Sequence, residues 1–140
     1  MIFTIHIITS LILAVISFPF IGLYPSIWVF LGGWTVDIDH YIWYIFKYRK
    51  FNMFECNRFF TVDSKKIDSY PYRGSFMPFH TIEFIILMVF LSIMWVPFMY
   101  LSIGLALHFM LDFISYLFIE KDFPCKHSII LWALAKNKKV

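Results

Sequence analysis

Charged residues are scarce in this chain and absent from two long stretches. Residues 1–36 and 84–111 contain no Asp, Glu, Lys or Arg, and charged residues make up only 15% of the 140, against about 25% in ordinary soluble domains. Hydrophobic residues make up 61%, and the mean hydropathy is +0.75. A soluble domain of this size has too little interior to bury so many apolar side chains. The scarcity of charge therefore argues against an ordinary soluble domain and favours a protein embedded in lipid.

Cysteine is nearly absent as well. The chain has Cys56 and Cys125, with no pair at the short spacing of a thiolate metal site. Both fall in segments that we expect on the cytoplasmic side, where thiols stay reduced. The first ten residues, MIFTIHIITS, contain no Lys or Arg, which argues against a cleaved signal peptide. These absences disfavour a disulfide-stabilised secreted protein.

The apolar stretches are long enough for four membrane helices, since a helix needs about 20 residues to cross the hydrocarbon core. We predict spans at roughly 3–18, 24–46, 79–98 and 101–119. Pro19 and Pro25 are expected to mark the first turn, because proline interrupts helices. The predicted fold is all-α, a four-helix transmembrane bundle forming a single domain over residues 1–140. A loop is expected at about 47–78 and a short tail at about 120–140.

All 12 basic residues lie in the predicted loop and tail. Short loops rich in Lys and Arg mark the cytoplasmic side of a membrane. Two helices separate the loop from the tail, and two precede the loop, so both termini are expected in the cytoplasm. We therefore predict an integral membrane protein. Its basic residues would serve topology and contact with anionic lipid rather than nucleic acid.

A few ionisable side chains interrupt the predicted spans, and each costs about 2.5–3.5 kcal/mol at the centre of a membrane helix. With a rise of about 1.5 Å per residue, Asp39 lies about 12 Å from the cytoplasmic end of its helix, and Asp112 about 14 Å. His6 and His80 lie near the same face. Polar groups from four helices are thus expected at one level. The full set is His6, Asp37, Asp39, His40, His80, Glu83, His108 and Asp112.

Local spacing places several of these groups on common helical faces. His108 and Asp112 are four residues apart, and His80 and Glu83 are three apart, so each pair shares a face. Taken singly, such a pair is more often an interhelical hydrogen-bonding pair than a pair of metal ligands. Glu83 also has an alternative partner in Arg73. It is the convergence at one depth that favours a shared site.

The three polar side chains of the stretch "DIDH" do not all face one point on a regular helix. Asp37 and His40 share a helical face, whereas Asp39 points about 160° away from Asp37 on a regular helix. All three can face one point only where the helix is distorted. Gly32 and Gly33, just upstream, favour such a distortion or a close approach of another helix.

Histidine and carboxylate side chains on inward faces of a four-helix bundle are typical of a metal site. Nitrogen and oxygen ligands without thiolate suit Zn²⁺, Mn²⁺ or Fe²⁺, and we expect zinc. Such an ion acidifies bound water and polarises a phosphoryl or carbonyl oxygen. We expect Asp39, His80, His108 and Asp112 as core ligands, with His6, Asp37 and His40 as further ligands or orienting groups. Asp37 and Glu83 are the candidate catalytic groups, Glu83 as ligand or general base.

Four segments resemble the YdjM-like family of predicted membrane-bound, metal-dependent hydrolases. That family shows a Thr-His near the N-terminus, a Gly-x-x-x-Pro-Asp-x-Asp-His stretch, a central His motif and a Gly-x-x-x-His-x-x-x-Asp helix. In this chain Val36 stands in place of the proline, and "FHTIEF" lacks the usual Arg and Thr-His-Ser pattern. The corresponding segments are "TIH" ending at His6, "GWTVDIDH" at 33–40, "FHTIE" around His80 and "GLALHFMLD" at 104–112.

The resemblance implies a small helical inner-membrane protein that binds a divalent metal. The family is distantly similar to zinc-dependent phospholipase C, which implies a phosphoester or lipid-linked substrate. An anionic substrate or lipid would be attracted by the basic loop.

Other functions remain open from the sequence. The buried His and Asp residues would also serve transport of metal or protons, although the outer halves of the predicted helices are mainly apolar. Paired histidines would suit haem ligation, which leaves the carboxylates without a role. A non-catalytic scaffold leaves the same carboxylates uncompensated.

Overall fold

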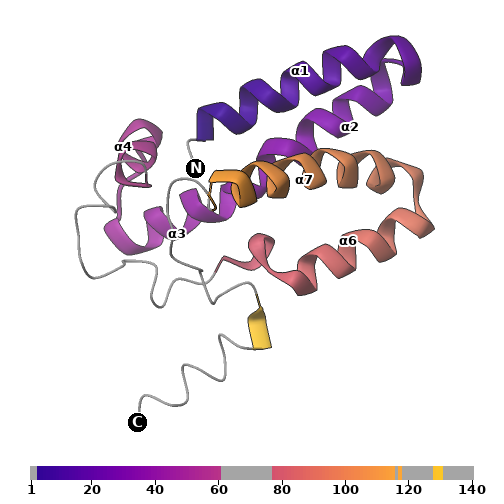
Figure 1. Ribbon diagram of the computed structural model, residues 1–140. Coiled ribbons are helices and arrows are strands. Elements are labelled where there is room, and N and C mark those ends of the chain that lie inside the picture. The colour runs from indigo at the N-terminus through magenta and orange to yellow at the C-terminus, as the bar shows by residue number, and fades with distance from the viewer. Residues whose placement is uncertain (1–2, 61–76, 116, 118–127, 131–140) are drawn as a thin grey trace.

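The computed structural model describes residues 3–60, 77–115, 117 and 128–130, which form helices and short connections with no β-strand among them (Figure 1). The prediction of an all-α fold is therefore confirmed. The described elements are α1 (Phe3–Ile21), α2 (Leu23–Trp34), the 3₁₀ turn η1 (Thr35–Asp37), α3 (Ile38–Tyr48), α4 (Met53–Arg58), the 3₁₀ turn η3 (Pro78–His80), α6 (Ile82–Met94) and α7 (Val96–Ser115).

Helix α2 packs against both α1 and α7, and α6 packs mainly on α7 (Figure 1). Small residues allow these close contacts. A Cβ atom on Gly104 would collide with the backbone carbonyl of Val29, and one on Gly33 would collide with the side chain of Ser10. The sequence thus brings the three helix backbones together at glycine positions, as small residues do in membrane bundles.

The first predicted span is confirmed as a helix, but its end differs from the prediction. Helix α1 continues through Pro19 to Ile21, and the chain turns at Gly22, whose φ is 84°. Residues with a Cβ atom avoid this left-handed conformation, so glycine is suited to the turn. Pro19 lies in the last turn of α1, and because it has no N–H it cannot donate to the carbonyl of Val15. Pro25 lies in the first turn of α2, where its lack of an N–H costs little.

The predicted span over 24–46 is not one regular helix. Helix α2 ends at Trp34, η1 covers Thr35–Asp37, and α3 begins at Ile38. Trp34 has φ −132°, outside the helical range. The distortion anticipated near Gly32 and Gly33 is therefore present, a few residues beyond them.

The break between the last two predicted spans also shifts. It falls at Trp95, between α6 and α7, rather than at residues 97–102. Pro97 instead lies in the first turn of α7, where the helix has no hydrogen bond for proline to remove. Residues 118–119 of the predicted fourth span lie outside the described residues.

Among the described residues, two helices are long and apolar enough to cross a membrane, namely α1 and α7. Helix α6 is apolar but shorter. Large apolar side chains cover the outward faces of these helices, as at Phe20 (84% exposed) and Ile93 (79% exposed). Helix α4 lies within the predicted loop, whose residues 61–76 are outside the described part, as is most of the predicted tail.

Candidate metal centre

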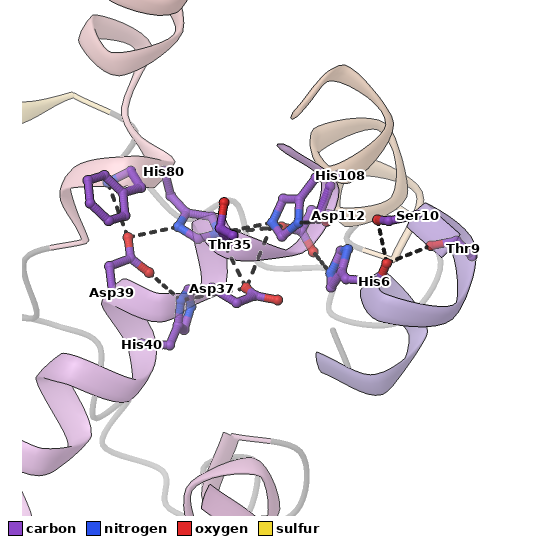
Figure 2. Close-up of polar contacts among 12 residues, drawn as sticks. His6, Thr9, Ser10, Thr35, Asp37, Asp39, His40, His80, His108 and Asp112 are labelled. Atoms are coloured by element: carbon purple, nitrogen blue, oxygen red, sulfur yellow. Dashed lines mark hydrogen bonds and ion pairs between the residues drawn. The ribbon is translucent and has the colours of Figure 1, made fainter. Parts of the chain in front are cut away.

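Seven of the predicted site residues meet at one end of the bundle, where α1 and α6 begin and α7 ends (Figures 1 and 2). They come from three helices, α1, α3 and α7, and from the 3₁₀ turns η1 and η3. They are His6 from α1, Asp37 from η1, Asp39 and His40 from α3, His80 from η3, and His108 and Asp112 from α7.

The centre of the cluster lies between two imidazole nitrogens. His80 Nε2 and His108 Nε2 are 3.2 Å apart, and Asp37 Oδ1 lies 3.7 and 3.8 Å from them. On another side, Asp112 Oδ2 lies 3.2 Å from His108 Nε2 and 3.8 Å from His80 Nε2. Ligand atoms bound at about 2.0–2.1 Å in a tetrahedral site lie about 3.3 Å apart. The separations therefore suit ligands that share a divalent ion.

The orientation of the His108 ring is set by a backbone group. His108 is fully buried, and its Nδ1 lies 2.9 Å from the carbonyl oxygen of Gly33. A carbonyl only accepts, so Nδ1 carries the proton and donates it. In the neutral ring, Nε2 is then left with a lone pair that faces the centre of the cluster.

The His80 ring is oriented in the same way by a carboxylate. His80 Nδ1 donates to Asp39 Oδ2 at 3.0 Å, and the backbone N–H of Phe79 donates to the same oxygen at 3.2 Å. The other oxygen, Asp39 Oδ1, lies 2.7 Å from His40 Nδ1. This carboxylate–histidine arrangement is typical of the groups that orient metal ligands. Asp39, expected from the sequence as a core ligand, orients two histidines and also forms, with His40 and His80, a group that could itself hold a metal ion.

The two histidines therefore present lone pairs to each other across 3.2 Å. Neither neutral ring has a proton left to share, and two acceptors at this distance repel each other. A cation between them removes the repulsion, and Asp37 and Asp112 supply negative charge on its flanks. Buried His and Asp groups of this kind can hold a metal ion.

His6 supports the far side of the cluster. Its Nε2 lies 3.1 Å from Asp112 Oδ1, and its ring stacks on that of His108 with centroids 3.9 Å apart. Its Nδ1 is buried without a hydrogen-bond partner among the described residues. The arrangement allows His6 either to hold Asp112 in place or to act as a ligand beside His108 and Asp112.

The charges of the cluster, like its distances, favour a bound cation. Within the described part of the chain, the ion-pair partners of Asp37, Asp39 and Asp112 are all histidines. Neutral imidazoles do not balance three carboxylates in a site shielded from water. A divalent cation would provide the missing charge and lower the cost of burial.

The turn η1 explains how all three polar residues of "DIDH" reach the cluster. On a regular helix Asp37 and Asp39 would point in nearly opposite directions. The tighter winding of η1 before α3 changes this, so that Asp37 contacts His80 Nε2 and Asp39 contacts His80 Nδ1 (Figure 2). One histidine is thus held between two carboxylates from the same short segment.

Glu83 is not brought to the cluster. Its carboxylate accepts hydrogen bonds from Ser128 Oγ at 2.6 Å, from Ile129 N at 3.0 Å and from Ile130 N at 3.4 Å. The spacing of His80 and Glu83 suggested a common face, but His80 lies in η3, and the extended backbone of Thr81 separates η3 from α6. Glu83 therefore holds the C-terminal segment, and we do not propose it as a general base.

One side of the cluster opens into a pocket of about 100 Å³. Asp37, His40 and Asp112 are among the residues that line it, and the Asp112 side chain is 28% exposed. Helix α4 contributes to the same lining, through residues including Met53 and Cys56. The buried ligand atoms are thus accessible to a small molecule from one direction.

Cys56 is expected to resist alkylation in the folded protein. Burial, together with the negative charge of Asp37, raises the pKa of its thiol to about 12. The reactive thiolate is therefore nearly absent at neutral pH. Treatment with iodoacetamide at pH 7.5, followed by peptide mass spectrometry, should label Cys56 only after denaturation. Labelling of the native protein at the rate of the unfolded chain would contradict this prediction.

Comparison with known proteins adds no assignment. No family model, curated protein or solved structure matches this chain. The functional interpretation therefore rests on the geometry of the site and on the sequence pattern.

Sequence reasoning missed two features of the site. The carbonyl of Gly33 orients His108, and no side-chain pattern signals a backbone acceptor. The lining contributed to the pocket by α4, including Cys56, was not anticipated.

Proposed function

We propose that this protein is a membrane-bound, metal-dependent hydrolase that acts on a phosphoester or lipid-linked substrate. The observation that carries the proposal is the approach of His80 Nε2 and His108 Nε2 to 3.2 Å, flanked by Asp37 and Asp112. The pocket beside them supplies access for a substrate. The arrangement combines a cation site with an open side, which hydrolytic metal sites require.

The proposed setting is a four-helix transmembrane bundle with both termini in the cytoplasm. Helices α1 and α7 have the length and composition of spans, and the exposed apolar side chains of α6 are suited to lipid. Helix α6 is shorter than a full span, and its crossing is proposed from its packing beside α7. The basic residues near the cluster end favour a cytoplasmic site.

Zinc is the proposed ion, because the imidazoles of His80 and His108 and the carboxylate of Asp112 lie at separations that suit three ligands of a tetrahedral N/O site. The fourth position would then stay open beside Asp37. When bound, a divalent ion acidifies water and polarises a phosphoryl or carbonyl oxygen. The residues that would contact a substrate are the ionisable ones that line the pocket, namely Asp37, His40 and Asp112. Asp39 and the Gly33 carbonyl hold the two central histidines in the orientation that binding requires.

Membership of the YdjM-like family is part of the proposal. The four segments that carry the resemblance supply all seven residues of the cluster. The same segments would be expected to converge in a family whose motifs are metal ligands. Glu83 has a different role in this chain, which leaves Asp37 as the candidate catalytic carboxylate.

The proposal is tested by assaying detergent-purified protein against a panel of phosphomonoesters and phosphodiesters, with metal content measured in parallel. We expect Zn²⁺-dependent hydrolysis that is lost, by a factor of about 10² or more, in Asp112→Asn. An Asp112→Asn variant with wild-type metal content and activity would overturn the assignment. Bound metal without hydrolysis of any substrate would instead favour transport of ions through the cluster.

A further inference from the structure

We propose that the pocket binds the anionic head group of a membrane amphiphile, with the apolar chain leaving the pocket over Met53 of α4. This inference rests on the proposed function and deepens it by naming the substrate class. It makes α4 the element that selects a lipid over a water-soluble ester.

The pocket lining combines ionisable and apolar side chains. Asp37, His40 and Asp112 are among the first, and Met53 and Phe60 are among the second. Its volume of about 100 Å³ is smaller than an apolar cavity of about 150 Å³ that accepts benzene. It has room for a head group but not for an acyl chain, so a chain must continue outside.

The outer side of α4 is suited to the membrane interface. Phe51 and Phe54 are 75% and 88% exposed, and Met53 is 51% exposed. Exposed basic residues, including Arg49 and Arg58, flank this apolar group. Aromatic side chains at head-group level and basic residues that attract anionic lipid are the usual components of an interfacial segment.

Helix α4 is held firmly enough to form a pocket wall. The side chain of Asn52 caps it by accepting from Phe54 N at 2.9 Å and from Glu55 N at 3.3 Å. The hydroxyl of Tyr41 in α3 donates to the carbonyl of Phe51. On the inner side, Cys56 packs into a buried cluster with Tyr44. These contacts hold the backbone of α4, which carries the half-exposed side chain of Met53 beside the pocket.

The head group is charged and the apolar chain is not, so their contributions to binding can be measured separately. Without a cation, the carboxylates of Asp37 and Asp112 repel an anionic head group, so binding of the head group requires the divalent ion. Contact of the chain with Met53 requires no ion. Removal of metal should therefore abolish only the contribution of the head group.

Native mass spectrometry of the detergent-solubilised protein tests this with three probes: short-chain phosphatidylglycerol, the diacylglycerol of the same chain length, and glycerol 3-phosphate. The Zn²⁺-loaded protein is expected to bind phosphatidylglycerol at least about tenfold more tightly than either other probe, a difference of about 1.4 kcal/mol. A chelator should reduce its affinity to that of diacylglycerol. If the chelator has no effect, the metal site of the proposed function fails.

The contribution of α4 is tested by Met53→Asp, with Phe54→Asp as the matched control on the outer side of the same helical turn. Acidic residues are tolerated in the first turn of a helix, so both variants should fold and retain metal. Met53→Asp should weaken phosphatidylglycerol binding about tenfold and leave glycerol 3-phosphate binding unchanged. Equal affinities for phosphatidylglycerol in the two variants, with metal retained, would overturn the inference and leave the hydrolase proposal intact.

Discussion

The His108→Ala variant is expected to purify without the divalent metal that the wild-type protein retains. His108 Nε2 lies 3.2 Å from both His80 Nε2 and Asp112 Oδ2, and 3.8 Å from Asp37 Oδ1. Changes to groups that only orient ligands cost about 10–100-fold in affinity, so loss of a ligand should cost more than about 100-fold. Elemental mass spectrometry of detergent-purified protein measures the metal directly.

Asp39→Asn tests the same site without removing volume from the core. The amide keeps the shape of the carboxylate but removes its charge and one of its two acceptor oxygens, so it cannot accept from both His80 Nδ1 and His40 Nδ1. We expect metal affinity to fall about 10–100-fold while the protein remains folded. The variant therefore separates an effect on the metal from an effect on folding.

Glu83→Gln is the control for both variants. The sequence placed Glu83 among the candidate site residues, whereas the structure places it on Ser128 and Ile129. Its metal content should equal that of the wild type. Wild-type metal content in His108→Ala, or loss of metal in Glu83→Gln, would show that the cluster is not the metal site.

Gly104→Ala is expected to destabilise the bundle by about 3 kcal/mol, at the upper end for an overpacked core. The added Cβ would overlap the carbonyl of Val29 and lie 2.7 Å from Gly33 N. Both atoms belong to the backbone of α2 and cannot move aside as a flexible side chain would. Separation of α7 from α2 would also move His108 away from the Gly33 carbonyl. Equilibrium unfolding in detergent, with metal content measured on the same samples, should show both effects.

The matched control for this variant is Ala106→Val, two residues further along α7. Ala106 is exposed, so its larger replacement gains carbon atoms without meeting another helix. Its stability should stay within about 0.5 kcal/mol of the wild type. An equal loss of stability in the two variants would mean that the close contact of α2 and α7 does not depend on glycine.

Much of the candidate site could be predicted because the cost of burying charge is a property of the sequence. His108 and Asp112 stand out in an apolar helix, and their spacing alone places them on one face. The roles of Asp37 and Asp39 could not be predicted in this way. They depend on η1, whose tighter winding turns both toward His80.

The boundaries of the helices were also only partly predictable from the sequence. Pro19 and Pro25 suggested the place of the first turn, yet the chain turns at Gly22. A proline costs little in the first turn of a helix, and α1 continues for two residues past Pro19, so a proline marks a boundary only to within a turn. The left-handed conformation at Gly22, in contrast, is incompatible with a continued helix.

The sequence by itself determined the all-α class, the apolar exterior and the set of polar residues that need a common partner, because these follow from composition and helical periodicity. Only the tertiary structure decided which atoms face one another. The assignment of protons on His80 and His108 depends on Asp39 and on the Gly33 carbonyl, which are remote from them in the chain. Hydrogen bonds between distant segments are set by the packing of α2 against α7, and no local pattern of residues encodes their geometry.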